Sequence, residues 1–153
     1  MSRTIRRLSG VTYWVLRDPV EIWSYINSNV TKEWEEDDRD DGVDPEADGW
    51  LLSLPRRGWS LRALEVGAIR LDPETMSRDG FVARLEERSD ELLRCVTLYG
   101  AVIWPLVVRG EDTMLMDGYC RFSTLEKMGT RRALAYVGTS RMPAKALRRH
   151  NVM

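Results

Sequence analysis

In three stretches of the chain, apolar residues recur at every third or fourth position, which predicts helices that bury one face. These stretches are residues 19–35, 81–99 and 119–128. Gly100 and Gly129 follow the second and third stretches, where a left-handed glycine commonly ends a helix. The apolar faces consist of Trp23, Ile26, Val30 and Trp34 in the first helix, Phe81, Leu85, Leu92, Val96 and Tyr99 in the second, and Phe122, Leu125 and Met128 in the third.

Runs of β-branched, aromatic and aliphatic residues predict five strands. The predicted strands are residues 11–16, 64–71, 102–108, 113–116 and 132–137, the last of them ending at Gly138. The third and fourth strands read as a hairpin that leads into a turn at Asp117 and Gly118. Residues 50–59 show no clean period, and we expect them to pack over the core as a loop or short strand.

Ten of the sixteen residues from 33 to 48 are acidic. A calcium-binding loop does not fit, because Arg39 occupies a ligand position of such a loop and Asp44 an apolar one. We interpret this segment as a solvated or mobile acidic loop. Two further roles stay open for it, namely a docking surface for a basic partner and a lid over a binding site.

Composition places the chain among single-domain soluble proteins. The 153 residues are 43% hydrophobic and 31% charged, which is an ordinary globular mixture. The net charge of −1 gives no overall electrostatic reason to expect nucleic-acid binding. Cys95 and Cys120 lack metal or redox spacing, and neither a signal peptide nor a long apolar span is present, so we expect a cytoplasmic protein. The one histidine, His150, lies in a basic tail, which excludes histidine-dependent nucleophile triads.

The turn at Asp117-Gly118 is the most informative polar motif. Asp117 can cap the helix that follows, and Gly118 permits close approach of backbone. Arg121 then faces the positive end of the helix dipole, which is unfavourable by up to ~1 kcal/mol unless an anion binds there. We therefore interpret Asp117-Gly118-x-x-Arg121 as a candidate phosphate site. The alternative is that Asp117 merely caps the helix while Arg121 points into solvent.

An ordered series of motifs in the second half of the chain resembles the ParB N-terminal-like, sulfiredoxin-like superfamily. The series consists of Asp72-Pro73 after a strand, a helix running to Gly100, Trp104-Pro105 before a valine-rich strand, a hairpin, Asp117-Gly118-Tyr119-Cys120-Arg121, Leu125, Gly129 and the last strand. The resemblance implies an α+β fold with a small mixed sheet and flanking helices. We expect a single domain, 1–153, in which 64–138 form this core, 1–60 an N-terminal extension and 139–153 a basic tail.

The superfamily divides by its chemistry at this motif. ParB partition proteins bind CTP with a Gly-x-x-Arg motif on the phosphates, which Gly118 and Arg121 match. Sulfiredoxins carry a cysteine two residues before that arginine and use ATP to repair over-oxidised peroxiredoxin. Tyr119 occupies the cysteine position in this chain, and Cys120 stands where sulfiredoxins have histidine. Cys120 nevertheless remains a candidate reactive thiol, because a helix N-terminus and an adjacent arginine lower a thiol pKa.

Free-serine kinases of the superfamily carry Asp-Gly-His-x-Arg, with the aspartate near the substrate hydroxyl and an upstream glutamate assisting. Asp117 and Arg121 match this motif, whereas Tyr119 replaces the histidine. Glu74 or Asp79 could stand for the upstream acid. The resemblance thus implies catalytic roles for Asp117 with one of these acids, and a role for Asp117 in holding Mg²⁺.

Three functional hypotheses follow. The first is an enzyme that transfers phosphate from ATP, ADP or CTP, with Mg²⁺, to a small hydroxyl compound such as a free amino acid, and that binds the nucleotide through Gly118, Tyr119, Cys120 and Arg121. The second is a non-catalytic nucleotide-dependent switch or adaptor that meets a protein partner through the acidic loop or the basic tail. The third is a thiol role for Cys120. We expect no specific DNA binding, since only about fifteen residues follow the last predicted strand.

Overall fold

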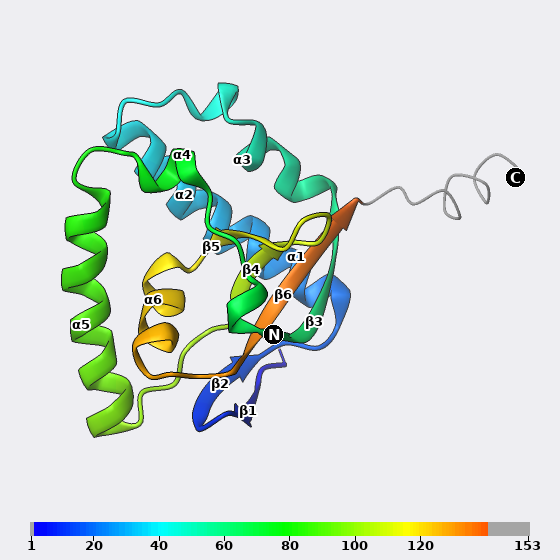
Figure 1. Cartoon of the computed structure of the whole chain (residues 1–153). Helices are drawn as coiled ribbons and strands as arrows, with labels where there is room; N and C mark the ends of the chain where they lie inside the picture. Colours follow the sequence, from blue (N-terminus) through cyan, green and yellow to red (C-terminus); the bar gives the residue numbers. More distant parts are fainter. Residues whose placement is uncertain (1, 141–153) are drawn as a thin grey trace, which may run out of the picture.

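The computed structural model describes residues 2–140, which form an α+β fold (Figure 1). Its main sheet has four strands in the order β3-β6-β4-β5. In this sheet β6 runs antiparallel to β3 and parallel to β4, while β4 runs antiparallel to β5, so the sheet is mixed. The predicted fold class, a small mixed sheet with flanking helices, is therefore confirmed.

The strands are β1 (Thr4–Leu8), β2 (Val11–Val15), β3 (Arg57–Glu65), β4 (Leu106–Arg109), β5 (Met114–Asp117) and β6 (Arg132–Ser140). The α-helices are α1 (Pro19–Tyr25), α2 (Thr31–Asp40), α3 (Gly49–Ser53), α4 (Pro73–Met76), α5 (Phe81–Tyr99) and α6 (Tyr119–Lys127). A π-helical turn, Ile26–Val30, joins α1 to α2, and short 3₁₀ turns occupy Pro45–Ala47, Leu54–Arg56 and Val66–Ala68.

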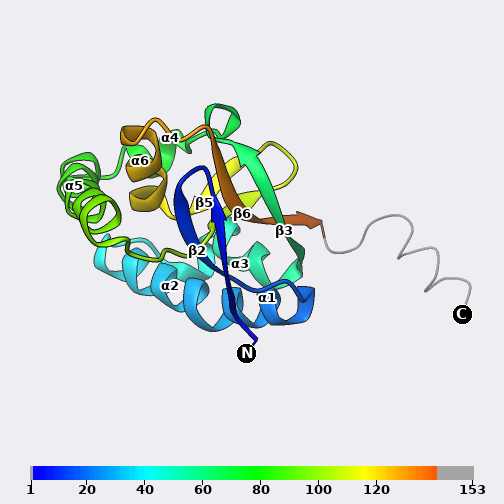
Figure 2. The same ribbon diagram turned by 90° about the horizontal axis from the view of Figure 1, so that it is seen from below.

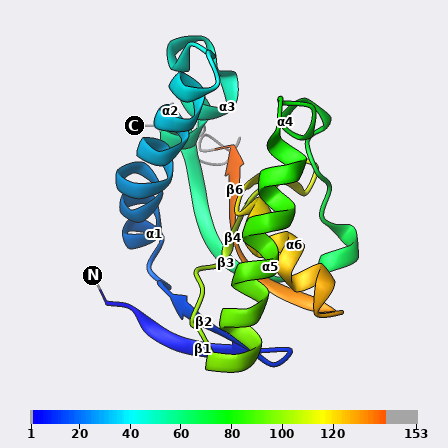
Figure 3. The ribbon, with the colours of Figure 1, turned by 90° about the vertical axis from the view of Figure 1, so that its left-hand side faces the viewer.

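The sheet lies between two helical layers, with α1 and α2 on one side and α5 and α6 on the other (Figure 3). The period-two alternation of strand residues feeds a separate core on each face. In β4, Leu106 and Val108 pack on the α5–α6 side, whereas Val107 packs on the α1 side. Tyr136 of β6 also enters the α1-side core, where its hydroxyl accepts a hydrogen bond from the backbone N–H of Leu16 at 3.0 Å.

The N-terminal residues are part of the same body as the predicted 64–138 core. Strand β3, which begins at Arg57, pairs along its whole length with β6. The β1–β2 hairpin joins the segment before β4 through Tyr13 and Ile103, and Val11, Tyr13 and Val15 are fully buried in the α5–α6-side core. Figure 2 shows this hairpin in front of the sheet.

Three strand predictions were wrong. The strand predicted over 102–108 begins only at Leu106. Residues 64–71 do not form a strand, since β3 ends at Glu65 and a 3₁₀ turn follows. The last strand does not stop at Gly138 but continues to Ser140. Gly138 serves close packing rather than termination, because a Cβ atom there would lie 2.6 Å from the Trp59 ring. The segment 50–59, expected to be a loop or short strand, begins instead with α3 and a 3₁₀ turn.

The acidic segment is largely helical, which corrects its interpretation as a loop. Helices α1 and α2 and the π-turn between them run as one continuous rod (Figure 2). Asp38, one of the ten acids, is fully buried, and its carboxylate pairs with Arg78 at 3.3 Å. The predicted helix over 19–35 covers α1, the π-helical turn and the first half of α2, and it ended too early because acidic, mostly exposed residues fill the second half of α2.

The helices that flank the candidate motif agree with the prediction. Helix α5 spans the predicted residues and ends at Gly100, whose φ of 63° is left-handed. Gly129 follows α6 with a φ of 70°. Among residues 2–140, no helix is both long and apolar enough to cross a membrane. The predicted basic tail, from residue 141 onward and including His150, lies outside the described residues.

Candidate functional site

A cavity of about 700 Å³ lies between α2 on one side and α4, α5 and the start of α6 on the other. Figure 3 shows these two groups of helices facing each other across the edge of the sheet. The predicted motif residues Asp117, Gly118, Tyr119, Cys120 and Arg121 all line this cavity. The structure therefore brings together the predicted motif and the acidic segment, for which a place over a binding site was one of the roles left open.

The turn between β5 and α6 places Arg121 beside Asp117. The Arg121 guanidinium donates to the Asp117 carboxylate at 3.0 Å and to the carbonyl of Trp104 at 3.3 Å. Gly118 has a φ of 98°, and a Cβ atom there would lie 2.8 Å from the Arg121 guanidinium. Glycine is thus required both for the backbone conformation and for the close approach of Arg121.

Neither part of the alternative reading of this motif holds. The N-cap of α6 is Gly118, and no side-chain hydrogen bond caps the helix, so Asp117 is not its cap. The side chain of Arg121 is only 18% exposed and does not extend into solvent. The first hydrogen bond of the helix is donated by Phe122 to Gly118, so the preceding N–H groups have no partner within α6. An anion in the cavity would meet these N–H groups beside the guanidinium.

Helix α5 and the segment before it contribute three more arginines to the cavity, Arg78, Arg84 and Arg88. Arg78 pairs with Asp38 and with Asp41 of the α2 end, each at 3.3 Å. Arg84 lies 3.9 Å from Asp41. The sequence does indicate this group of arginines, because Arg84 and Arg88 are four residues apart and therefore lie on one helical face. Sequence reasoning missed it because it gave the helix only a packing role.

Helix α2 forms an acidic wall opposite the arginines, with Glu33 and Asp37 one helical turn apart. Burial raises the pKa of Glu33, and repulsion from Asp117 and Asp37 adds to the rise. Burial also raises the pKa of Asp37, again with a contribution from Asp117. The carboxylates of Glu33, Asp37 and Asp117 therefore repel one another. The cavity carries negative charge on the α2 side and positive charge on the α5–α6 side.

Aromatic side chains form the inner part of the cavity. Tyr25 stacks on Trp104 with ring centroids 4.4 Å apart, and Trp34 and Phe81 also line the space. Burial raises the pKa of Tyr25, so its phenol stays neutral. The cavity thus offers an apolar, flat surface next to its charged walls, which suits a ligand that is charged at one end and aromatic or apolar at the other.

Tyr119 and Cys120 face the cavity with different chemistry. The Tyr119 hydroxyl donates to the carbonyl of Leu115 and accepts from the N–H of Asp72, both at 3.1 Å, so it ties α6 to the segment before α4. Burial raises the pKa of the Cys120 thiol, although Arg121 and Arg88 oppose this rise. The expectation of a lowered thiol pKa was therefore wrong, and the third hypothesis loses its physical basis.

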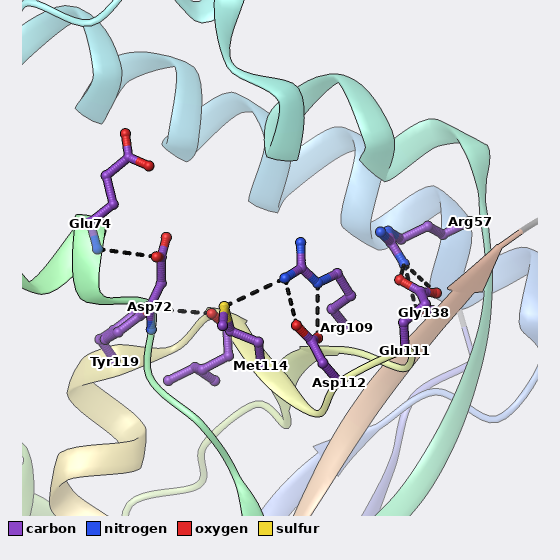
Figure 4. Close-up of polar contacts among 10 residues, drawn as sticks. Arg57, Asp72, Glu74, Arg109, Glu111, Asp112, Met114, Tyr119 and Gly138 are labelled. Atoms are coloured by element: carbon purple, nitrogen blue, oxygen red, sulfur yellow. Dashed lines mark hydrogen bonds and ion pairs between the residues drawn. The ribbon is translucent and has the colours of Figure 1, made fainter.

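The structure does not bring the predicted upstream acids into this cavity. Glu74 lies on α4 with an exposed side chain, and its backbone N–H donates to the Asp72 carboxylate at 3.1 Å. In Figure 4 the Glu74 carboxylate points away from Asp72 and Tyr119. Asp79 lines a separate, smaller hollow beside Arg78. Among the described residues, the acids that share the cavity with Asp117 are Glu33, Asp37, Asp40 and Asp41, and neither Glu74 nor Asp79 is one of them.

Mg²⁺ fits this donor set only as part of a bound phosphate ligand. No three or more histidine, cysteine or acidic side chains within residues 2–140 are arranged to hold a metal ion. Mg²⁺ ordinarily binds through one or two carboxylates together with substrate phosphates and water. Asp117 could supply such a carboxylate, whereas a site made wholly of protein side chains is not present in the described part of the chain.

No protein-family model matches the sequence, and no curated protein matches it. Two solved structures of pNOB8-like ParB N-terminal domains are similar to 54% of this chain. One is 16% identical with a TM-score of 0.42, and the other is 20% identical with a TM-score of 0.40. The match spans 30% and 28% of the lengths of those chains. The similarity concerns part of the fold alone.

Proposed function

We propose that this cavity binds the phosphate end of a nucleotide and supports phosphate transfer to a small hydroxyl compound such as a free amino acid. The observation that carries the proposal is the convergence in one cavity of the α6 N-terminus, Arg121 and the arginines of α5 with Asp117 and an aromatic surface. The positive groups suit the phosphates of a nucleotide, and the aromatic surface suits its base.

The phosphates would lie at the first turn of α6. The unpaired N–H groups there and the Arg121 guanidinium point positive charge at the same space. Gly118 lets the Arg121 guanidinium lie against the backbone at this turn, where a Cβ atom would crowd it. The flat side of the ligand would lie towards Trp34 and Phe81, which line the same cavity.

Asp117 is the group best placed for the transfer itself. It would accept the proton of the attacking hydroxyl while the hydroxyl oxygen forms a bond to the terminal phosphorus. The bond from that phosphorus to the bridging oxygen would break at the same time, and the nucleotide would leave with one phosphate fewer. Arg121 would neutralise the charge that develops on the phosphoryl oxygens. Mg²⁺, when bound with the nucleotide, would supply further charge neutralisation.

A non-catalytic nucleotide-dependent switch is the second candidate, and one observation favours it. Arg78 and Arg84 reach across the cavity to acids at the end of α2. A phosphate that competed with Asp41 for these arginines would loosen α2, and ligand binding would then change the surface offered to a partner.

Product analysis after incubation with ATP or CTP, Mg²⁺ and a panel of free amino acids distinguishes the two candidates. The enzyme hypothesis predicts a phosphorylated product that Asp117→Asn abolishes while nucleotide binding persists. Asp112→Asn is the matched control, because Asp112 pairs with Arg109 away from the cavity. Nucleotide binding without product, together with faster hydrogen exchange in α2, would support the switch and contradict the enzyme.

A further inference from the structure

Arg88 differs from the other arginines of the cavity in having no partner. Arg121 pairs with Asp117, Arg78 pairs with Asp38 and Asp41, and Arg84 lies near Asp41. Among the described residues, Arg88 makes no ion pair or hydrogen bond, although it lines the same cavity. Its guanidinium is therefore the one cavity cation, within that part of the chain, that a ligand can engage without displacing an existing partner.

The packing of α5 on α6 places Arg88 beside the phosphate end of the cavity. The Thr124 hydroxyl of α6 donates to the carbonyl of Ser89 at 3.3 Å, which brings the turn containing Arg88 level with the first turns of α6. The Arg88 charge acts on both Cys120 of α6 and Asp37 of α2, lowering their pKa values against the rise that burial causes. Arg88 lines the same cavity as Cys120 at the start of α6 and Asp37 of the acidic wall.

The charge that a ligand brings decides whether Arg88 is needed. A single phosphate can be neutralised by the α6 N-terminus and Arg121. A second or third phosphate adds negative charge near Asp37 and Glu33, which repel it. A longer phosphate chain therefore requires another cation on the α5 side, and Arg88 is placed there.

We propose that Arg88 is a second phosphate-binding residue, which makes the cavity selective for di- and triphosphates over monophosphates. This inference rests on the proposed nucleotide site and adds the length of the phosphate chain that the site accepts. It also assigns the binding role to a residue of α5, outside the Asp117-to-Arg121 motif.

The experiment is a calorimetric measurement of Kd for AMP, ADP and ATP, and for CMP, CDP and CTP, on the wild type and Arg88→Gln. Inorganic phosphate and tripolyphosphate are titrated in parallel. Arg94→Gln is the matched control, since Arg94 is an exposed arginine of the same helix that does not line the cavity. Melting temperatures without ligand verify that the variants are folded, because Arg88 is exposed and makes no described contact that the fold needs.

We expect Arg88→Gln to weaken binding of the di- and triphosphates by about tenfold or more and that of the monophosphates by less than about twofold, with Arg94→Gln unchanged. Equal weakening of all three phosphate lengths, or no change for triphosphates, overturns the inference and leaves the nucleotide site standing. Arg88-dependent binding of tripolyphosphate without any nucleotide binding supports the inference and overturns the proposed function. Failure of the wild type to bind any of these probes overturns both.

Discussion

Asp38 is the acid whose burial matters most for stability. Its side chain is fully buried, one carboxylate oxygen accepts from Arg78 at 3.3 Å, and the other accepts no hydrogen bond from a donor within residues 2–140. Burial raises the pKa of Asp38 from 3.8 to about 7, the neighbouring Asp48 carboxylate adds to the rise, and Arg78 opposes it. A protonated Asp38 can donate to Asp48, so the folded protein holds a proton there that the unfolded chain releases above about pH 4.

Asp38→Asn should therefore stabilise the protein, and more so at about pH 8 than at about pH 5. The raised pKa means that the folded form binds more protons between the ordinary pKa and about 7, so wild-type stability through this group falls as the pH rises over that window. Asparagine keeps an acceptor for Arg78 and adds a permanent donor. Thermal melts at both pH values measure the effect, and a variant that loses the same amount of stability at each pH would refute this account.

Gly118 offers a second test at a single position. Both Gly118 and Gly129 have left-handed φ values, but only Gly118 has neighbours within reach of an added Cβ atom, at 2.8 Å from the Arg121 guanidinium and 3.1 Å from Leu106. Both Gly118→Ala and Gly129→Ala should lower the free energy of unfolding by about 1–2 kcal/mol through backbone strain. Gly118→Ala should lower it further, because the added Cβ atom meets Arg121 and Leu106. Denaturant unfolding of both variants measures the difference. Equal losses of stability would mean that Arg121 does not need its observed position.

At the scale of elements, helix α2 is held over the cavity largely by charge. Its end is joined to the segment between α4 and α5 by the pairs of Arg78 with Asp38 and Asp41. Within α2 only Asp38 is buried, and the apolar packing of the helix comes from the partly buried Trp34, which contacts the α1-side core and Trp50. Removing Arg78 would leave the buried Asp38 carboxyl without its donor and Asp41 without its cation, whereas asparagine at position 38 keeps an acceptor for Arg78.

Arg78→Gln should loosen α2 without unfolding the sheet. We expect faster hydrogen exchange of the amides of residues 34–41, while the amides of β4 and β6 keep their protection. Arg39→Gln is the control, because Arg39 is exposed and its one ion pair within residues 2–140 is with Glu35 of the same helix. Unchanged exchange in α2, or an equal increase throughout the sheet, would contradict the view that Arg78 holds this helix in place.

The same elements show why some of the structure could be predicted from sequence and some could not. Helix α5 has a regular apolar face and a left-handed glycine after it, so its bounds followed from local rules. Strand β3 lacks alternation because it is an edge strand with partly exposed residues on both faces, and its position was missed. The pairing of Asp38 with Arg78 joins residues forty positions apart, which no local pattern reveals.

At the scale of the molecule, the fold sets two helical layers around the four-stranded sheet (Figure 3). A charged cavity lies between α2 of one layer and α5 and α6 of the other. The motif from Asp117 to Arg121 could be predicted as a candidate site because an Asp-Gly turn followed by an arginine in the first turn of a helix is visible in the local sequence. The opposing wall could not, because Glu33 and Asp37 reach the motif only through the packing of the α1–α2 rod on the sheet.

The most direct test of the central claim is a thermal-shift panel with ATP, ADP, CTP and GTP, with and without Mg²⁺, on the wild type and Arg121→Ala. The account predicts that at least one nucleotide raises the melting temperature of the wild type and that Arg121→Ala abolishes this rise. Arg131→Ala, at an exposed arginine paired only with Glu65, should keep it. No shift with any nucleotide, or a shift that survives in Arg121→Ala, would contradict the assignment of the phosphate site to this cavity.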